Sequence, residues 1–392
     1  MSGKVFTQDI VTDKELKYAN HTEITEHSAV LDVVTEGEAV EKGRIFAEQI
    51  TNGFVADFEK PGDQMAHVST FIVDKDMVYM TYYANTKEPS EDPKNQTARL
   101  AYAPKDDMSK MVWLDLQTTG DVVDGRLVDM VYDTILMRKD EDTLYVLWTA
   151  RVEENYYRFY CPFSIKEKKL GEVKVNRLKI GEVVNDFSAT GIRAALAAND
   201  LPCKQMYSDI GIMQKLSARV EDGVKYYYTG AYSGDLTFIM KSRDLITWEY
   251  VAQPEFDNLS QWENATYVIG DKCYYFVRQH VERPYSFLTA YDLVTGKWDK
   301  PVMVGDSQSR GDFIEYDGGL YLFHAPHDRE HIGIVKVDTE DISRSSILLQ
   351  AKMDTSCFYP FVQYYDEKKL AMSYTIARKH IRLAEFDLSK CL

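Results

Sequence analysis

The chain of 392 residues carries 46 lysines and arginines against 62 aspartates and glutamates, a formal net charge of −16. This balance argues against a general binder of nucleic-acid backbones, which needs an extended basic surface, but it allows a local cationic site. With 45% hydrophobic residues the chain can bury a large core, and its 27 tyrosines and 17 phenylalanines favour β-strands. We therefore expect an all-β protein.

The first residues, MSGKVFTQDIVTDKEL, contain no apolar run, so we predict no secretory signal peptide. No stretch reaches the roughly 18 apolar residues of a membrane span, and we expect no membrane partner. We therefore predict a cytoplasmic protein, with a secreted protein whose signal has been removed as the alternative.

Five cysteines are spread along the chain without a Cys-x-x-Cys pair: Cys161, Cys203, Cys273, Cys357 and Cys391. An odd number at wide spacing argues against a disulfide framework or a zinc site and favours free thiols in a reducing compartment. No cluster of metal-ligand residues is visible, so we expect no metal and no cofactor.

Six segments share one pattern, a short turn followed by an aromatic-rich strand. They are DKDMVYMTYYA, DEDTLYVLWTA, EDGVKYYYTGA, IGDKCYYFVRQ, YDGGLYLFHAP and YDEKKLAMSYT. Their aligned positions are Tyr79, Tyr145, Tyr227, Tyr274, Tyr321 and Ala371. Asp-Gly and Asp-Lys pairs provide the turn chemistry. The last three intervals are about 50 residues, and a period of about 40 to 50 residues with four strands per unit is typical of β-propeller blades.

Residues 160–215 separate the second aromatic strand from the third and include FSATGIRAALAANDL, the only long helix-like pattern. We predict a six-bladed β-propeller with four antiparallel strands per blade, in one domain over residues 1–392, with a partly helical insertion near residues 185–201. Seven blades is the alternative, in which residues 160–215 form another blade. The last strand, HIRLAEFDL, is expected to pair with early strands, because a propeller closes its ring to remove a sheet edge.

A weaker repeat places an acidic residue a few positions before a tryptophan, in APKDDMSKMVW, KSRDLITW and AYDLVTGKW. These turns resemble a degenerate form of the Asp-box of sialidase-like propellers. Ordinary hairpin decoration is the alternative interpretation of any single copy.

Polar residues stand where the innermost strands of the blades would begin: His67, Asp209, Glu263, Arg310, Asp312 and Tyr359. Arg278 and Arg329 stand at the ends of the following strands. Innermost strands converge on the axis of a propeller, where ligand sites form. We therefore predict one site built from residues far apart in the sequence.

From Glu263 to the C-terminus, the chain resembles the sialidase superfamily in the order of four residues, Glu263, Arg278, Arg329 and Tyr359. The resemblance implies that Glu263 activates Tyr359 as a nucleophile and that the two arginines bind a substrate carboxylate. A neutral tyrosine avoids the repulsion between an anionic nucleophile and that carboxylate, but its pKa near 10 requires an adjacent base. Planar guanidinium groups are suited to holding a carboxylate.

The first blade departs from that family, because sialidases have an arginine at its head where this chain has His67. For the acid/base aspartate that follows, the resemblance implies Asp92, with Glu91 beside it. A histidine at the head resembles instead propeller lyases that act on uronic acids, such as rhamnose–glucuronate lyases and ulvan lyases. Arg310 and His327 are weaker candidates for substrate binding, since their loops could simply be solvated surface.

Three functions remain open, each with an acidic oligosaccharide or glycoconjugate as the partner. The first is an exo-acting, retaining glycoside hydrolase that removes a terminal sialic or uronic acid, and the four C-terminal residues fit it best. The second is a lyase that abstracts the proton next to a uronate carboxylate, with Tyr359 or His67 as the base. The third is a non-catalytic glycan-binding propeller.

Overall fold

The computed structural model describes residues 4–18, 30–31, 37–203, 209–213, 215–234, 236–254, 260–279 and 285–392. Within these ranges the chain folds into six β-sheets, so the all-β expectation is confirmed. We number the sheets 1 to 6 in chain order. No helix in the same ranges is both long and apolar enough to cross a membrane.

Sheets 1 to 3 are built mainly from antiparallel hairpins. Sheet 1 consists of β3 (Met65–Asp74), β4 (Met77–Asn85), β5 (Gln96–Pro104) and β6 (Val112–Thr118). Sheet 2 consists of β7 (Val122–Val123), β8 (Arg126–Arg138), β9 (Thr143–Val152), β10 (Asn155–Ser164), β11 (Lys169–Leu170) and β12 (Lys174–Val175). Sheet 3 consists of β15 (Gly211–Ile212), β16 (Ser217–Glu221), β17 (Val224–Ser233), β18 (Leu236–Ser242), β19 (Thr247–Ala252), β13 (Arg177–Ile180) and β14 (Val183–Asp186).

Sheets 4 to 6 repeat this arrangement. Sheet 4 consists of β20 (Ser260–Ile269), β21 (Lys272–Gln279), β22 (Tyr285–Asp292), β23 (Lys297–Trp298), β24 (Val302–Gly305) and β1 (Val30–Leu31). Sheet 5 consists of β25 (Asp312–Tyr316), β26 (Gly319–His324), β27 (His331–Val337) and β28 (Ser346–Lys352). Sheet 6 consists of β29 (Phe358–Tyr364), β30 (Leu370–Ile376), β31 (His380–Phe386) and β2 (Phe54–Asp57).

The six predicted aromatic strands are present as β4, β9, β17, β21, β26 and β30. Each pairs with the strand before it in the chain (β3, β8, β16, β20, β25 or β29) and with the strand after it. We call the earlier strand of each pair the first strand and the aromatic strand the second. Residues 177–186, inside the long interval, form β13 and β14, which extend sheet 3 through the parallel pairing of β13 with β19.

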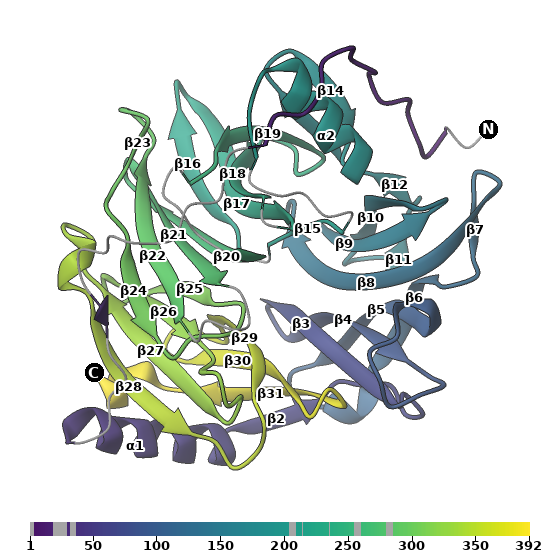
Figure 1. The fold of residues 1–392 in the computed structure, drawn as a ribbon. Coiled ribbons are helices and arrows are strands. Elements are labelled where there is room, and N and C mark those ends of the chain that lie inside the picture. Colours follow the sequence, from purple (N-terminus) through teal and green to yellow (C-terminus); the bar gives the residue numbers. More distant parts are fainter. Residues whose placement is uncertain are drawn as a thin grey trace.

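The sheets follow one another around the molecule, from sheet 1 in blue to sheet 6 in yellow (Figure 1). A hydrophobic cluster joins sheet 6 to sheet 1, and in it the ring centroids of Phe71 and Phe361 are 5.5 Å apart. The early strand β2 pairs with β31, so the predicted pairing of the last strand is confirmed. Sheet 6 therefore combines an N-terminal strand with three C-terminal strands.

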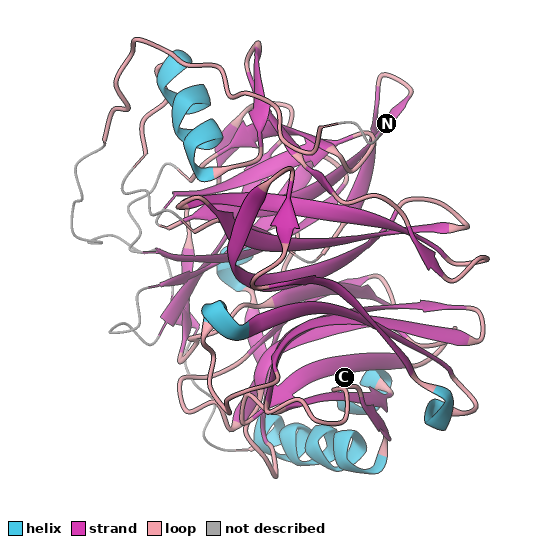
Figure 2. Ribbon diagram, turned by 90° about the vertical axis from the view of Figure 1, so that its right-hand side faces the viewer, coloured by secondary structure: helices cyan, strands magenta, loops and turns pink. Residues whose placement is uncertain are grey.

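The described residues form two α-helices, which lie at opposite ends of the molecule (Figure 2). Helix α2 (Ala189–Ala198) lies inside the predicted helical stretch, and its N-cap residue Ser188 accepts the Gly191 N–H at 2.8 Å. Helix α1 (Glu38–Asn52) was not expected, so the prediction of a single long helix-like segment is wrong. Its buried face consists of Gly43, Phe46 and Ile50 alone, which makes a weak apolar periodicity in the sequence.

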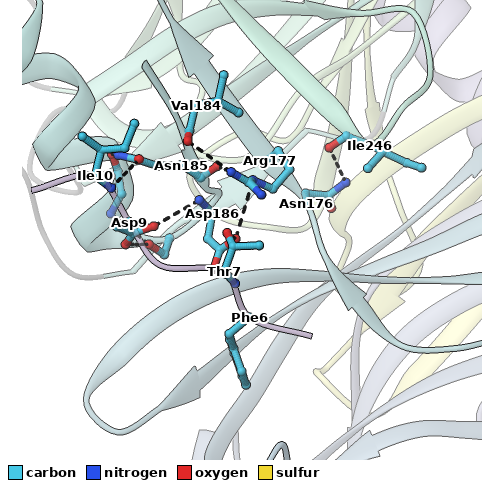
Figure 3. Close-up of polar contacts among 12 residues, drawn as sticks. Phe6, Thr7, Asp9, Ile10, Asn176, Arg177, Val184, Asn185, Asp186 and Ile246 are labelled. Atoms are coloured by element: carbon cyan, nitrogen blue, oxygen red, sulfur yellow. Dashed lines mark hydrogen bonds and ion pairs between the residues drawn. The ribbon is translucent and has the colours of Figure 1, made fainter. Parts of the chain in front are cut away.

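An N-terminal segment crosses the outer edge of sheet 3 and binds the residues that lead into α2 (Figure 3). Asp186 accepts the Thr7 N–H at 2.8 Å, and Asn185 accepts the Ile10 N–H at 2.8 Å. Asp9 accepts the N–H of Asp186 at 3.1 Å. These contacts attach the start of the chain to a segment more than a hundred residues away in sequence.

Candidate active site

The candidate residues occupy one position that recurs among the sheets. Each aligned residue of a second strand pairs with a residue of the first strand: Tyr145 with Met137, Tyr274 with Tyr267, Tyr321 with Ile314 and Ala371 with Gln363. Four residues before those partners stand Asp133, Glu263, Arg310 and Tyr359. His67 stands five residues before Ile72, which is the partner of Tyr79. Because the sheets repeat, these equivalent positions meet at one end of the first strands.

Irregular pairing re-aims several of these side chains. The register shifts near His67 in β3, near Asp133 in β8 and near Tyr359 in β29. Asp133 and Tyr359 have φ angles of 51° and 55°, and Val68, next to His67, has 49°. Bulges turn side chains out of the regular ladder, and such a backbone costs about 1–3 kcal/mol unless its surroundings hold it. Asp133, Tyr359 and the residue after His67 are therefore held in a strained geometry.

Glu263 and Arg278 form a buried ion pair between the first two strands of sheet 4. Their exposed fractions are 4% and 7%. Burial lowers the pKa of Arg278, but Glu263 raises it, and the pKa ends above its ordinary value. Tyr359 also raises the pKa of this guanidinium. Arg278 therefore stays charged between the glutamate and the tyrosine.

Arg310 is held by Asp133, a residue that the sequence analysis did not select. Its Nη2 donates to Asp133 Oδ1 at 2.8 Å, and both side chains are buried. The other carboxylate oxygen accepts the Tyr232 hydroxyl at 3.2 Å, and Arg158 Nη1 donates to the Asp133 carbonyl at 2.6 Å. Burial lowers the pKa of Arg310, but Asp133 and then Glu263 raise it above its ordinary value. The guanidinium is thus a fixed cation.

Arg329 approaches from the loop between β26 and β27. Its guanidinium donates to Ser309 Oγ at 3.0 Å and to the Gln308 carbonyl at 2.7 Å. Its own carbonyl accepts the Cys357 N–H at 2.6 Å, two residues before Tyr359. Arg329 is half-buried, so part of it stays open to solvent.

Tyr359 lies among these three arginines. The centre of its ring is 5.4 Å from the Arg310 guanidinium carbon and 5.9 Å from that of Arg329. Burial and then the charge of Glu263 raise the pKa of the Tyr359 phenol, while the arginines oppose the shift. The phenol is therefore neutral at neutral pH. We call Glu263, Arg278, Arg310, Arg329 and Tyr359 the arginine–tyrosine cluster.

His67 lies beside the cluster as a buried residue, with its ring centroid 4.9 Å from that of Tyr359. Its Nδ1 is 3.1 Å from the Thr375 hydroxyl. Burial and then the charges of Arg378, Arg329 and Arg310 hold the pKa of His67 well below its ordinary value. The head of β3 therefore offers a neutral imidazole, not a fourth cation.

Glu91 is linked to His67 through Tyr83, whereas the contacts of Asp92 are local. Glu91 accepts the Tyr83 hydroxyl at 2.5 Å and pairs with Arg378 at 3.1 Å, and the Tyr83 ring packs against His67 at 5.8 Å. Asp92 uses one carboxylate oxygen to accept the Lys94 N–H and the other to accept the Asn95 amide. The structure therefore gives Asp92 a local turn-capping role and brings Glu91 to the rim of the cluster.

The sequence matches no protein-family model and no curated protein. In three dimensions the chain is similar to a protein of unknown function from Dyadobacter fermentans, with a TM-score of 0.55 and 12% identity over 85% of this chain and 98% of that chain. It is also similar to a mutant of the NanB sialidase from Streptococcus pneumoniae, with a TM-score of 0.55 and 9% identity over 86% and 71% of the two chains. The Hadza microbial sialidase Hz136 aligns with a TM-score of 0.56 and 10% identity over 84% and 66%.

The fold is sialidase-like. At these identities the likeness concerns the fold alone, so the roles of individual residues depend on the geometry described above.

Three further candidates have other partners in this sialidase-like fold. The His327 side chain is exposed, and its backbone N–H donates to Asp306. Asp312 is buried two residues after Arg310 and pairs with Lys215. Asp209 is half-buried, and its charge contributes to the raised pKa values of Tyr132 and Tyr232.

Two residues of the site, Asp133 and Arg158, were missed by the sequence analysis. A signal for Asp133 was present, since it stands twelve positions before Tyr145, as His67 does before Tyr79 and Tyr359 before Ala371. Arg158 lies in β10, inside the aromatic run NYYRFYCPF, where a single charged residue would be expected to face outward. Its side chain is instead fully buried. The contact with Asp133 explains the burial of Arg158, because buried charges need a partner.

One group of metal-ligand residues occurs in the part of the chain that the structure describes, formed by Asp57, Glu59 and His380. Its oxygens already have protein partners, because Arg382 donates to both carboxylate oxygens of Asp57 at 2.8 and 3.0 Å and His380 lies 2.6 Å from Glu59. It joins β2 to β31 and contributes no residue to the cluster.

Proposed function

We propose that this protein is a carbohydrate-active enzyme, an exo-acting glycoside hydrolase of the sialidase type that removes a terminal sialic or uronic acid. The observation that carries the proposal is that Arg310 and Arg329 contact the ring of Tyr359, while Arg278, which is paired with Glu263, acts electrostatically on the same tyrosine. Three guanidinium groups around one phenol suit an anionic substrate and a neutral nucleophile.

The proposed architecture is a single domain with six blades, one for each sheet. The packing of sheet 6 on sheet 1 and the pairing of β2 with β31 support a closed ring. Asp244, in one of the turns that resemble an Asp-box, accepts the N–H groups of Ile246 and Thr247 at 2.8 Å each, which supports that interpretation.

The substrate carboxylate is proposed to bind the guanidinium groups of the cluster. Arg310 Nε and Nη1 and Arg278 Nε are buried and have no hydrogen-bond partner among the described residues. A buried donor without a partner costs about 1–3 kcal/mol, so a ligand carboxylate that accepts these hydrogens gains that energy on binding. An anion held here would also share Arg278 with Glu263, which loosens the ion pair and frees the glutamate to act as a base.

In the proposed reaction Tyr359 attacks the anomeric carbon, and its hydroxyl proton passes to Glu263 as the bond forms. The glycosidic carbon–oxygen bond breaks, and the leaving oxygen takes a proton from an acid at the rim. Glu91 is our first candidate for that acid because of its contacts with Tyr83 and Arg378, with Asp92 as the alternative. Water then hydrolyses the glycosyl–tyrosine bond. The rim carboxylate takes the proton of the attacking water, and Tyr359 takes its proton back from Glu263, which restores the enzyme.

A uronate lyase is the second candidate, and the neutral His67 next to Tyr359 favours it. In that reaction Tyr359 or His67 removes the proton beside the carboxylate, and the arginines stabilise the enolate-like intermediate. The product is an unsaturated uronate, which absorbs ultraviolet light, whereas hydrolysis gives a saturated sugar.

A screen of aryl sialosides, aryl glucuronosides and uronate-containing oligosaccharides tests the proposal, with product analysis and with Tyr359→Phe in parallel. We expect turnover by the wild type, a saturated sugar as the product, and loss of turnover in the folded variant. An unsaturated product would select the lyase. Binding of acidic sugars without any turnover would select the non-catalytic glycan-binding protein.

A further inference from the structure

A second buried ion pair lies next to the arginine–tyrosine cluster. Lys215, just before β16, and Asp312, the first residue of β25, have exposed fractions of 4% and 0%. Their Nζ and Oδ2 atoms are 3.1 Å apart. The pair joins sheet 3 to sheet 5 across residues that are distant in the sequence.

Both members of this pair bind the backbone of one residue in sheet 6. Asp312 Oδ2 accepts the Val362 N–H at 2.8 Å, and Lys215 Nζ donates to the Val362 carbonyl. Lys215 Nζ also lies 4.6 Å from the centre of the Phe361 ring. We call Lys215, Asp312 and the Val362 peptide groups the three-sheet clamp.

The clamp is next in sequence to two members of the cluster. Val362 follows Tyr359 by three residues, directly after the bulge in β29, and Asp312 follows Arg310 by two. A strained bulge persists only where its surroundings fix it, and the clamp fixes the first regular residues after this one. Arg310 and Tyr359 are therefore tied to each other through one carboxylate.

The position of Lys215 supports a role at the site. Lys215 stands twelve residues before Tyr227, the same interval that separates His67 from Tyr79 and Tyr359 from Ala371. On the other side, Leu216 and Gln363, the neighbours of Lys215 and Val362, line a cavity of about 810 Å³. The clamp thus separates the cluster from a cavity at the other end of the first strands.

Stability alone does not account for such a pair. Burial raises the pKa of the Asp312 carboxyl to about 6, although Lys215 opposes the shift, so keeping the carboxylate charged here costs desolvation energy. Apolar residues of similar volume often replace a buried ion pair without loss of stability. The geometry that the pair imposes on Val362 is what an apolar replacement would lose.

We propose that the three-sheet clamp is a positioning device that holds Tyr359 and Arg310 at the spacing that an acidic substrate requires. The catalytic part of this inference rests on the proposed function. The mechanical part, a coupling between the segments before β25 and in β29, does not depend on it.

Hydrogen–deuterium exchange tests the mechanical part without any substrate. In Lys215→Met we expect residues 309–316 and 357–364 to exchange at least about tenfold faster than in the wild type, because both segments lose the same anchor. Asp312→Asn keeps an acceptor for the Val362 N–H at nearly the same volume, and it is the variant to use if Lys215→Met does not fold. Faster exchange confined to the residues around position 215, or around position 312 in Asp312→Asn, would overturn the proposal.

Kinetics test the catalytic part, with an aryl glycoside of an acidic sugar that the wild type hydrolyses. Asp312→Asn is expected to lower kcat/KM by about 100-fold, with kcat reduced and KM raised, since small misplacements of reacting groups have effects of this size. The control is Asp63→Asn, which breaks the buried Asp63–Arg99 pair of sheet 1. If kcat and KM per folded molecule are unchanged in Asp312→Asn, the clamp has a structural role and does not position the catalytic residues. A wild type that hydrolyses no acidic sugar would refute the proposed function, and the exchange experiment would still decide the clamp.

Discussion

Glu263 and Arg278 stand at the open end of one hairpin, fifteen residues apart in sequence, and form a buried ion pair with each other. The proposed base of the reaction is thus paired with one of the proposed carboxylate anchors. A substrate carboxylate that binds Arg278 competes for the same guanidinium. The basicity of Glu263 and the binding of the carboxylate by Arg278 are therefore coupled. Removing the charge of Glu263 allows the two effects to be measured separately.

Glu263→Gln is expected to lower kcat by about 100- to 10,000-fold, the range that a general base contributes. The affinity for a free acidic monosaccharide should stay the same or rise, because Arg278 no longer has a competing carboxylate. Steady-state kinetics and titration calorimetry measure the two effects. Glu59→Gln, which removes the negative charge beside His380 in sheet 6, is the control that should change neither. A variant with normal kcat would exclude Glu263 as the base.

Arg310 is expected to bind the substrate through the two nitrogens that Asp133 does not use. Arg310→Lys keeps a cation for Asp133 but loses the planar fork, so KM for the acidic substrate should rise about 10- to 100-fold with little change in stability. Arg310→Met leaves the buried Asp133 without this counter-charge and should lower the free energy of unfolding by about 3 kcal/mol. Kinetics and denaturant unfolding check the pair of variants. Equal KM values for wild type and Arg310→Lys would contradict the binding role.

Much of this arrangement follows from the repeat in the sequence. The six aromatic strands indicate the order of the hairpins. A polar residue stands at an equivalent position in or just before the strand that precedes each of them, and this is why Glu263, Arg310 and Tyr359 could be predicted from the sequence. Helix α1 could not be predicted, because three buried residues in fifteen give little apolar periodicity. The sequence also could not show whether Glu91 or Asp92 faces the site, because this depends on contacts with side chains of other sheets.

Gly311 separates Arg310 from Asp312 and packs directly on sheet 4. A Cβ at this position would lie 2.8 Å from a ring carbon of the fully buried Phe276. Gly311→Ala is therefore expected to lower the free energy of unfolding by about 1–3 kcal/mol and to raise KM, because Arg310 has to move. Gly318, in the turn of the same hairpin, has open space around it but a φ of 72°, so Gly318→Ala should lower the free energy of unfolding without changing KM. An unchanged KM in Gly311→Ala would show that the Arg310 segment adapts without moving the guanidinium.

His324 makes stability depend on pH. Burial lowers its pKa from the ordinary value of 6.5 to about 4, and neither ring nitrogen has a hydrogen-bond partner among the described residues. Below pH 6.5 the unfolded chain binds a proton that the folded chain does not, so the free energy of unfolding falls as pH drops from about 6.5 to 4, by about 3 kcal/mol from this residue. Above pH 6.5 His324 contributes no slope.

His324→Met should flatten that part of the profile relative to the wild type, as urea unfolding at several pH values would show. The comparison of the two slopes isolates His324 from the carboxylates, which titrate in both proteins. Parallel profiles for the two proteins would mean that folding does not lower the pKa of His324.

The central claim is that the arginine–tyrosine cluster recognises a carboxylate on the sugar that is cleaved. The most direct test compares kcat/KM for an aryl glycoside of an acidic sugar with kcat/KM for its methyl ester, which has the same ring and leaving group but no charge. We predict that the ester is a poorer substrate by at least about 100-fold, because each charge-assisted hydrogen bond contributes about 1.5–3 kcal/mol. Equal kcat/KM values for the acid and the ester would contradict the account.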